Sequence, residues 1–460
     1  MYQIDFQKPI AIHFIGIGGI SMSGLAEILL KEGFRVTGSD SAVSALTKHL
    51  EAGGAVVYQG QRASNISPDT DLVVYTAAVH PDNPEFAEAV RQGLPMLTRA
   101  ELLGQMMKNY RQAVAIAGTH GKTTTTSMVT EILLAADADP TISVGGILHS
   151  IGGNIRVGHS DCFVTEACEY TNSFHSFFPT IEVILNIRED HLDFFKDLND
   201  IRNSFHTFAK LLTGDGLLII NADIPGYREL MNDLACPMVT FALEAEDADY
   251  RAEQITYNEK GYASFDVIRR GRKIGHLDLE VPGEHNIANA LAAAAVADAL
   301  HIPEEAIEKG LDGYTGTERR FEFKGNLGGV EIIDDYAHHP DEIKATLLAA
   351  EKLHKKKIWC VFQPHTYTRT KALMGEFAKA LSLADEVVLA KIYPARETDT
   401  LGISSADLAV EIEKLGTPVH YFESFGEIEK FLLENLVPNE LLITMGAGDV
   451  VKIGETLLGK

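Results

Sequence analysis

One stretch of the chain combines glycines, a lysine and threonines in an order that suits phosphate binding. An apolar run at residues 113–117 precedes Gly118, Thr119, His120, Gly121, Lys122, Thr123 and Thr124. In such a turn the backbone N–H groups face an anion, the lysine reaches the outer phosphates, and the next hydroxyl can bind Mg²⁺. A plain strand-to-helix turn with a solvated lysine is the alternative, because Ile116 stands where the general pattern has its first glycine.

Two other apolar runs end in acids. Residues 163–166 end at Glu166, and residues 181–187 precede Asp190 and His191. Carboxylates at the ends of neighbouring strands offer the hard oxygen ligands that Mg²⁺ prefers. A histidine beside carboxylates either completes a metal site or caps a helix, and the phosphate loop upstream favours the metal site.

A second glycine turn stands near the start of the chain. Gly16, Gly18, Gly19 and Ser21 follow an apolar strand, and Asp40 ends the next strand, where an acid can bind a ribose. Ser21 replaces the third glycine or alanine of a dinucleotide fingerprint. The turn can hold any diphosphate, so a UDP-sugar fits as well as NAD does, and tight packing of helix on strand is a third interpretation.

Polar side chains also gather in the last third of the chain, mostly after apolar strands. They are Arg320, Asp335, Tyr336, His338, His365 and Arg369. The carboxyl edge of a parallel sheet is where α/β proteins bind ligands, and a guanidinium fork suits a carboxylate or phosphate, although a surface salt bridge also explains a single arginine. His285 and Asn289 precede an alanine-rich helix at residues 290–299, where His285 could equally act as a helix cap.

Composition limits the class of protein. The 460 residues suggest about three domains, and 40 Lys and Arg against 65 Asp and Glu give a net charge of −25, which disfavours a nucleic-acid partner. Four cysteines without a CxxC pair predict reduced thiols. The chain shows no secretory leader and no run of 18 apolar residues, so we expect a soluble cytoplasmic protein without a membrane partner.

The order of apolar runs predicts the architecture. Strand-length runs alternate with helical patterns throughout, which is typical of α/β domains with parallel sheets. A charged stretch at residues 108–112 and a glycine-rich segment at residues 310–316 mark the boundaries. We therefore predict three domains, at residues 1–108, 109–316 and 317–460.

Seven motifs occur in the order known from one enzyme family. They are GIGGISMSGLAEIL, AGTHGKTTTT, PGEHNIANALAA, GTERRFEF, DDYAHHP, FQPHTYTRT and LLITMGAGDV. The chain resembles the Mur ligases over nearly its whole length, and the first motif with DDYAHHP and FQPHTYTRT resembles the alanine-adding members. The resemblance implies a Rossmann-like N-terminal domain for a UDP-sugar, a central phosphate-loop ATPase domain, and a Rossmann-like C-terminal domain that closes over ATP and the amino acid.

The resemblance also implies a reaction in peptidoglycan precursor synthesis. With ATP and Mg²⁺, the carboxylate of UDP-N-acetylmuramate would become an acyl phosphate, which the amine of L-alanine would attack. The products would be UDP-N-acetylmuramoyl-L-alanine, ADP and phosphate. This order is chemically sensible because phosphorylation turns a carboxylate oxygen into a leaving group. The chain would act as a monomer or weak homodimer.

Individual roles follow from the same resemblance. The implied catalytic residues are Lys122, His191, Arg320, His338 and Arg369. The implied nucleotide contacts are residues 118–124, His285, Asn289, Arg320 and Asp335. The implied metal ligands are Thr123, Glu166 and His191. The implied substrate contacts are Gly16, Gly18, Gly19, Ser21, Asp40, His80, Tyr336, His338, His365 and Arg369.

The chain departs from the family pattern in two places. Residues 167–174 read ACEYTNSF instead of the usual continuation after Glu166, and Thr366 stands where many relatives have arginine. We predict no carbamylated lysine at Lys210.

Three other functions compete with this interpretation. One is a ligase that joins a murein tripeptide to the same sugar nucleotide. The second is an NAD-dependent dehydrogenase built on the first glycine turn, and the third is a non-catalytic nucleotide switch. The dehydrogenase leaves the phosphate loop without a role, and a switch has no need of the histidines and arginines in the last domain.

Overall fold

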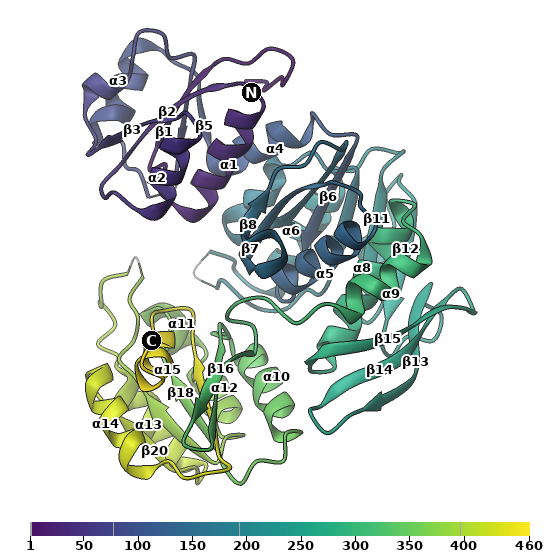
Figure 1. Cartoon of the computed structure of the whole chain (residues 1–460), viewed down its shortest axis with the longest axis vertical. Helices are drawn as coiled ribbons and strands as arrows, with labels where there is room; N and C mark the ends of the chain where they lie inside the picture. The colour runs from purple at the N-terminus through teal and green to yellow at the C-terminus, as the bar shows by residue number, and fades with distance from the viewer. Residues whose placement is uncertain (1, 77, 193, 396) are drawn as a thin grey trace.

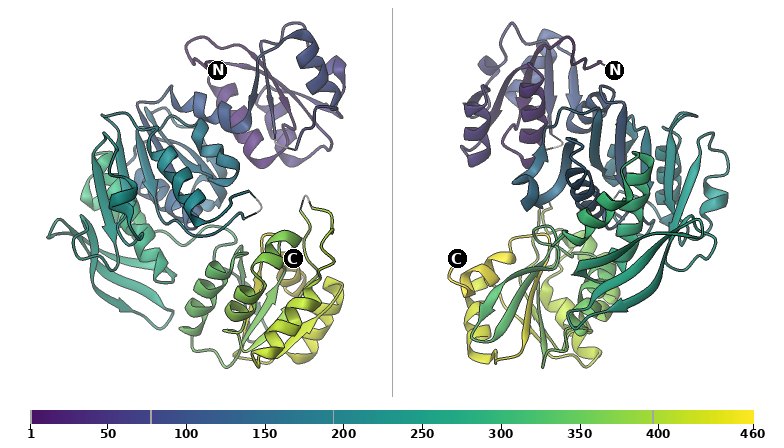
Figure 2. Two further views of the ribbon diagram at one scale, coloured as in Figure 1. Left: turned by 180° about the vertical axis from the view of Figure 1, so that it is seen from behind. Right: turned by 45° about the vertical axis from the view of Figure 1, so that its right-hand side comes forward.

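The computed structural model describes residues 2–76, 78–192, 194–395 and 397–460. These residues form three α/β domains that follow one another along an open arc (Figure 1). The views from behind and from the side show the N-terminal and C-terminal domains at the two ends of the arc, with the central domain between them (Figure 2). The predicted fold class, three α/β domains with Rossmann-like outer domains, is confirmed. The three residue boundaries stay predictions.

The N-terminal domain is a parallel sheet of five strands in the order β3-β2-β1-β4-β5. Its strands are β1 (Ala11–Ile15), β2 (Arg35–Asp40), β3 (Val56–Gln59), β4 (Leu72–Tyr75) and β5 (Met96–Thr98). Its helices are α1 (Ile20–Lys31), α2 (Ala45–Ala52), the 3-10 turn η1 (Ala63–Asn65), α3 (Pro84–Gln92) and α4 (Arg99–Met107). The chain changes direction across the sheet between β1 and β4, and such a switch point opens a ligand crevice at the carboxyl ends of the strands.

The central domain contains a ten-stranded sheet in the order β15-β14-β13-β12-β11-β10-β6-β9-β7-β8. Its strands are β6 (Gln112–Ala117), β7 (Thr141–Leu148), β8 (Gly153–Arg156), β9 (Cys162–Ala167), β10 (Ile181–Ile184), β11 (Leu217–Asn221), β12 (Met238–Ala242), β13 (Tyr250–Tyr257), β14 (Tyr262–Arg269) and β15 (Arg272–Pro282). Its helical segments are α5 (Lys122–Ala135), η2 (His149–Ile151), η3 (Tyr170–Ser176), α6 (Leu198–Ala209), α7 (Tyr227–Leu230), α8 (His285–Ala299) and α9 (Glu304–Asp312). The phosphate-loop strand β6 lies between β10 and β9, so both acid-ended strands flank it.

The C-terminal domain has six strands in the order β16-β17-β21-β18-β19-β20. Its strands are β16 (Glu322–Leu327), β17 (Val330–Asp335), β18 (Ile358–Phe362), β19 (Glu386–Leu389), β20 (Val419–Tyr421) and β21 (Leu441–Met445). Its helices are α10 (Pro340–Glu351), α11 (Tyr367–Ala372), α12 (Met374–Leu381), α13 (Ser405–Lys414), α14 (Phe425–Asn435) and α15 (Val451–Leu457). Among the described residues, no helix is both long and apolar enough to span a bilayer.

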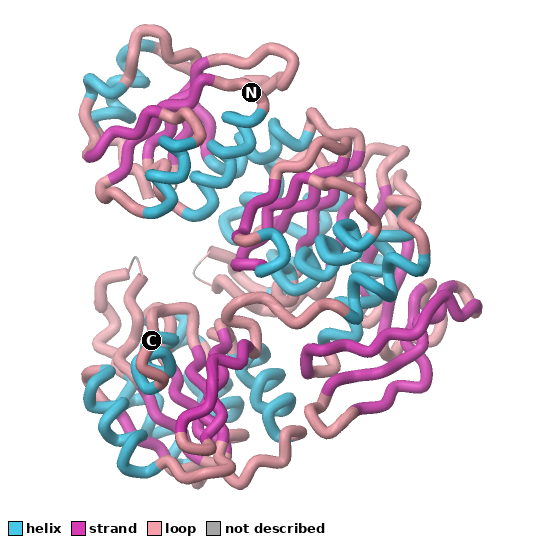
Figure 3. The backbone as a smooth tube through the Cα atoms, viewed as in Figure 1, coloured by secondary structure: helices cyan, strands magenta, loops and turns pink. Residues whose placement is uncertain are grey.

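Antiparallel hairpins are the main difference from the predicted parallel sheets. β7 pairs with β8, β16 pairs with β17, and β13, β14 and β15 form a meander. Figure 3 shows this meander as an arm of strands at the end of the central sheet away from the N-terminal domain. The strand predicted at residues 181–187 ends at Ile184, and beyond it Leu185 and Asn186 continue to bond the end of β6 and the phosphate loop. The alanine-rich helix starts earlier than predicted, at His285.

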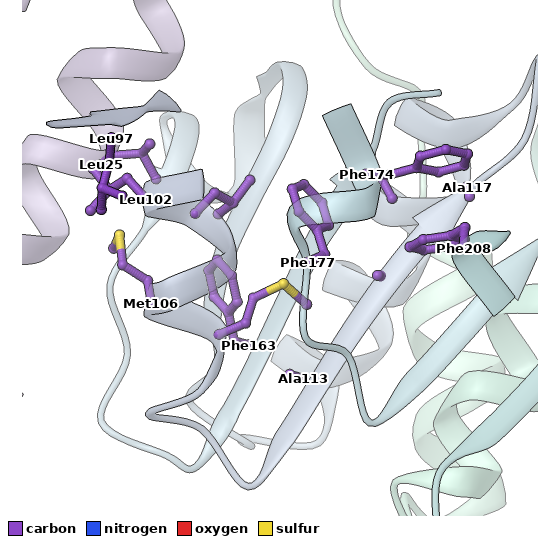
Figure 4. Close-up of a cluster of buried hydrophobic side chains, with 14 of the residues drawn as sticks. Leu25, Leu97, Leu102, Met106, Ala113, Ala117, Phe163, Phe174, Phe177 and Phe208 are labelled. Carbon is purple, nitrogen blue, oxygen red and sulfur yellow. The ribbon is translucent and has the colours of Figure 1, made fainter. Parts of the chain in front are cut away.

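One apolar core joins the N-terminal and central domains. Leu25 of α1, Leu97 of β5 and Met106 of α4 belong to the same buried cluster as Phe163 of β9 and Phe177 beside η3 (Figure 4). α4 packs closely on η3, since a Cβ added to Gly104 would lie 1.9 Å from the Ser176 carbonyl oxygen. Burial of apolar surface across the two domains therefore fixes α4 between them.

Candidate active site

The turn between β6 and α5 has the backbone of an anion site. Gly118 has a φ of 150° and Gly121 a φ of 88°, values that L side chains rarely adopt. Gly121 is the N-cap of α5 and supplies no side chain to bond the first N–H groups. These N–H groups and the positive end of the helix dipole suit a phosphate.

Lys122 is held in this turn by a carboxylate that sequence reasoning left without a role. Its Nζ donates to Glu169 Oε2 at 2.8 Å and to the Thr119 carbonyl at 3.1 Å. The Glu169 side chain is 2% exposed. Burial alone would lower the pKa of Lys122, but the charge of Glu169 raises it above its usual value. Lys122 is therefore a fixed cation at neutral pH.

Glu166 and Thr123 of the phosphate loop bring a carboxylate oxygen and a hydroxyl oxygen close together. Thr123 Oγ1 donates to Glu166 Oε2 at 3.2 Å, and the Gly145 N–H donates to Glu166 Oε1. A Cβ at Gly145 would lie 2.6 Å from Glu166 Oε2, so only glycine leaves room here. Burial raises the pKa of Glu166. A buried carboxylate beside a hydroxyl is a donor set that fits Mg²⁺.

His191 lies on the other side of Glu169. Its Nε2 is 3.8 Å from Glu169 Oε1 and 3.7 Å from Asp190 Oδ2, and its ring stacks on Tyr170 with centroids 4.5 Å apart. Burial lowers the pKa of His191, which leaves its ring uncharged at neutral pH. No hydrogen bond or ion pair joins Glu166 to His191 in the described part of the chain. Glu169 Oε1 is buried without a hydrogen-bond partner there, so one acceptor remains for a ligand.

The C-terminal domain reaches the loop through two arginines. Arg320 Nη2 donates to Thr123 Oγ1 at 3.4 Å. Arg369 Nη2 donates to Asp190 Oδ1 at 3.1 Å and approaches His191 Nδ1 at 3.4 Å. Burial opposes ionisation of Asp190, but the charge of Arg369 outweighs it and holds its pKa well below the usual range. These contacts tie the last domain to the phosphate loop and to the acidic segment after β10.

Glu342 makes a further link between the domains, and sequence reasoning missed it. Its Oε1 is 3.1 Å from His120 Nδ1, its Oε2 is 3.4 Å from His338 Nδ1, and it accepts the His338 N–H. Burial would raise the pKa of Glu342, but His338 and His120 hold it well below the usual value. The available signal was local: Glu342 closes a capping box with His339 at the start of α10.

Four predicted residues of the amino-acid side lie together. The ring of His338 is 5.5 Å from that of Tyr336 and 5.8 Å from that of His365, and Arg369 Nη1 is 3.4 Å from His365 Nδ1. Burial lowers the pKa of both His338 and His365 to about 4. Both histidine rings are therefore uncharged at neutral pH. Arg369, in contrast, is positively charged.

A cavity of about 600 Å³ lies between the central and C-terminal domains. Its walls include these predicted nucleotide contacts: His120, Gly121, Thr123, Thr124, His285, Asn289, Arg320 and Asp335. Gly118, Thr119 and Lys122 belong to the same loop but lie outside this lining. Burial raises the pKa of Asp335 to about 6, although its oxygens accept the Phe321 and Ala337 N–H groups. Burial lowers the pKa of His285 to about 4.

A second cavity, of about 370 Å³, lies at the carboxyl edge of the N-terminal sheet. Gly16, Asp40 and His80 line it. Gly18, Gly19 and Ser21 stand at the start of α1 and do not line it, but the Gly18 N–H donates to Asp40 Oδ2 at 2.9 Å. The structure thus places the predicted sugar-nucleotide residues in the first domain, apart from the phosphate loop.

Comparison with protein families accounts for this arrangement. The model of the Mur ligase family, catalytic domain, matches residues 11–111, that of the Mur ligase middle domain matches residues 116–297, and that of the Mur ligase, glutamate ligase domain, matches residues 319–448. The chain belongs to the Mur ligase family.

Full-length relatives of this Mur ligase carry specific names. It is 60% identical over 458 residues to a UDP-N-acetylmuramate–L-alanine ligase of Lachnospira eligens, and 58% identical over 460 residues to one of Agathobacter rectalis; both alignments cover 100% of each chain. Among solved structures, a UDP-N-acetylmuramate–alanine ligase of Thermotoga maritima is similar, with a TM-score of 0.80, 32% identity and 98% of each chain covered. A murein peptide ligase of Psychrobacter arcticus shares the fold, with a TM-score of 0.72 and 24% identity.

Proposed function

We propose that this Mur ligase joins L-alanine to UDP-N-acetylmuramate in an ATP-dependent reaction. The observation that carries the proposal is the convergence of three parts of the chain on the phosphate loop. Glu169 holds Lys122, Glu166 meets Thr123, and Arg320 of the C-terminal domain contacts the same threonine. The full-length likeness to two alanine ligases supports L-alanine as the amine.

In this proposal the triphosphate of ATP lies on the N–H groups of residues 118–124, and Lys122 contacts its outer phosphates. Thr123 and Glu166 hold Mg²⁺, with His191 at a second position. When bound, ATP would supply the phosphoryl group that turns the carboxylate oxygen into a leaving group, and Mg²⁺ would offset its negative charge. The adenine lies in the larger cavity near Asn289 and His285, with Arg320 and Asp335 on the facing domain.

In the proposed reaction, side chains of the protein stabilise and orient the charged groups of the substrates. Lys122 and Arg320 stabilise the negative charge that collects where phosphate and carboxylate meet. Arg369 orients the carboxylate of L-alanine, and Tyr336 and the uncharged rings of His338 and His365 surround its amino group. A neutral ring does not repel an ammonium group, whereas a charged one would. The glycine turn with Gly16, Gly18, Gly19 and Ser21 holds the UDP diphosphate, and Asp40 and His80 line the cavity beside it.

Phosphate release with different amines tests this proposal. With UDP-N-acetylmuramate, ATP and Mg²⁺ present, L-alanine should release phosphate, and a murein tripeptide should release little. Turnover with the tripeptide and none with L-alanine would replace the proposal with the peptide-ligase alternative. The cytoplasmic location and the monomeric or weakly dimeric state remain predictions, which fractionation and sedimentation measurements can check.

A further inference from the structure

Arg99 is the first residue of α4, the helix that lies between the N-terminal sheet and the central domain (Figure 4). It follows directly after β5, at the carboxyl edge of that sheet. Its side chain is partly buried, and no hydrogen bond or ion pair joins it to any other described residue. An arginine keeps its charge in folded proteins, so this position holds a cation without a counter-charge.

The local structure gives no reason for a cation here. A partly buried, unpaired charge costs free energy, and a helix begins at the positive end of its dipole. The carboxylate in the first turn, Glu101, caps the helix instead: its Oε2 accepts the Thr98 N–H at 2.7 Å and the Thr98 hydroxyl at 2.9 Å. Arg91, elsewhere in this domain, pairs with Glu88 at 2.6 Å.

One neighbour of Arg99, Cys168, lies on the phosphate-loop side of the domain seam. Its charge and the Cys168 thiol act on each other, and burial lowers the pKa of Arg99. Cys168 precedes Glu169, whose carboxylate holds Lys122 at 2.8 Å. α4, which begins with Arg99, also packs closely on η3, which follows Glu169, through the Gly104–Ser176 contact.

Sheet geometry relates Arg99 to the first glycine turn. The turn follows β1, and Arg99 follows β5, with β4 between these strands. Two strand spacings amount to about 10 Å. An anion on the glycine turn and an anion on Arg99 would therefore be separated by about the width of a hexose ring and its substituent.

We propose that Arg99 binds the lactyl carboxylate of the sugar nucleotide, the group that is activated, and holds it at the domain seam beside the phosphate loop. This inference rests on the proposed function and assigns a further binding residue to it. The guanidinium fork matches a carboxylate with two parallel hydrogen bonds. The diphosphate is the weaker candidate, because the glycine turn that would hold it lies two strands away.

Calorimetric titration with two nucleotides tests the assignment. UDP-N-acetylmuramate and UDP-N-acetylglucosamine share the diphosphate and the hexose, but only the first has the lactyl carboxylate. Arg99→Met should weaken binding of the first about 10- to 100-fold and change binding of the second less than about twofold. Arg99→Lys should give an intermediate loss, since it keeps the charge without the fork. The control Arg91→Met should change neither affinity.

Other outcomes would overturn the inference. If Arg99→Met loses the same affinity for both nucleotides, Arg99 binds the diphosphate instead. If Arg99→Met binds both nucleotides as tightly as the wild type does, Arg99 binds neither of them. Because the variant removes an unpaired charge, its melting temperature should equal or exceed that of the wild type, and a lower one would indicate a structural role. If Arg99→Met does not fold, Arg99→Lys tests the inference instead: it should lose more affinity for UDP-N-acetylmuramate than for UDP-N-acetylglucosamine. A wild-type protein that binds neither nucleotide would overturn the proposed function itself.

Discussion

The N-terminal and central domains each place a glycine turn between a buried strand and a helix, but their charges differ. Gly16 and Gly121 have nearly the same φ, 84° and 88°. The N–H of Gly18 in the first turn faces the carboxylate of Asp40, whereas the second turn carries Lys122. In the proposed function the same backbone serves two tasks: the first turn only holds an anion, and the second also stabilises the charge that develops during phosphoryl transfer.

The two domains also differ in the hydrogen bonding of a buried glutamate. Glu85 is fully buried in the first domain, where Ser39 and Asn65 each donate to it at 2.5 Å. Glu182 is fully buried in β10 of the second, and neither of its oxygens has a partner among the described residues. The first domain satisfies Glu85, whereas the second leaves Glu182 unpaired, although its Glu169 pairs with Lys122.

Replacing Lys122 should produce the largest contrast between the two turns. Lys122→Ala removes the cation at the reacting phosphates, so kcat should fall by at least about 10³-fold. Affinity for UDP-N-acetylmuramate should change less than about twofold, because the proposed function places that nucleotide on the other turn. Steady-state kinetics and calorimetry measure the two effects. Lys210→Ala, which removes an exposed lysine paired with Asp233, is the control. Equal losses of turnover and nucleotide affinity would remove the distinction between the turns.

Replacing Gly121 or Gly16 by alanine should weaken the binding of ATP in one case and of the sugar nucleotide in the other. Gly121→Ala must adopt a φ of 88° and places its Cβ 2.7 Å from Asn289 Oδ1, so we expect KM for ATP to rise about tenfold. Gly16→Ala has a φ of 84° and a Cβ 3.3 Å from Thr76 Cγ2, and should raise KM for the sugar nucleotide instead. Substrate titrations of both variants check this. A rise in the same KM for both would contradict it.

The satisfied glutamate should stabilise its domain. Burial would raise the pKa of Glu85, but the nearby His13 ring, 3.5 Å away, and hydrogen bonds from Ser39 and Asn65 lower it below the usual value. A lowered pKa favours the fold above the unfolded pKa and loses that benefit as pH falls through the folded value. Glu85→Gln should therefore lower the free energy of unfolding by about 1 to 3 kcal/mol at pH 7. Urea unfolding at pH 7 and pH 4 should show a smaller loss at pH 4; the reverse order would be evidence against the pairing.

The unpaired glutamate should have the opposite and smaller effect. Burial raises the pKa of Glu182 well above its usual value, so its cost to the fold is absent at low pH and grows as pH rises. Glu182→Met should raise the melting temperature by about 2 to 4 °C at pH 8, and by less at pH 5. The exposed Glu259→Met serves as control. A gain that is larger at pH 5 would contradict the assignment.

Local patterns predicted the phosphate loop, because a strand, a glycine turn and a helix start lie within a dozen residues there. The partners of that loop could not be predicted in the same way. Lys122 and Glu169 are 47 positions apart, and His120 and Glu342 are 222 positions apart. Which of several acids meets each cation depends on how β9, η3 and α10 pack, and periodicity carries no such information. The β13–β15 meander was missed because residues 253–257 of β13 are exposed and do not offer the buried strand face that periodicity detects.

The path of one oxygen atom tests the central claim most directly. UDP-N-acetylmuramate labelled with ¹⁸O in its lactyl carboxylate is incubated with the enzyme, ATP, Mg²⁺ and L-alanine, and the released phosphate is examined by mass spectrometry. If the phosphate loop activates the carboxylate by phosphorylation, the bridging oxygen leaves with the phosphate, so each phosphate from fully labelled substrate contains one ¹⁸O. Phosphate without label, released together with the alanine adduct, would contradict the account.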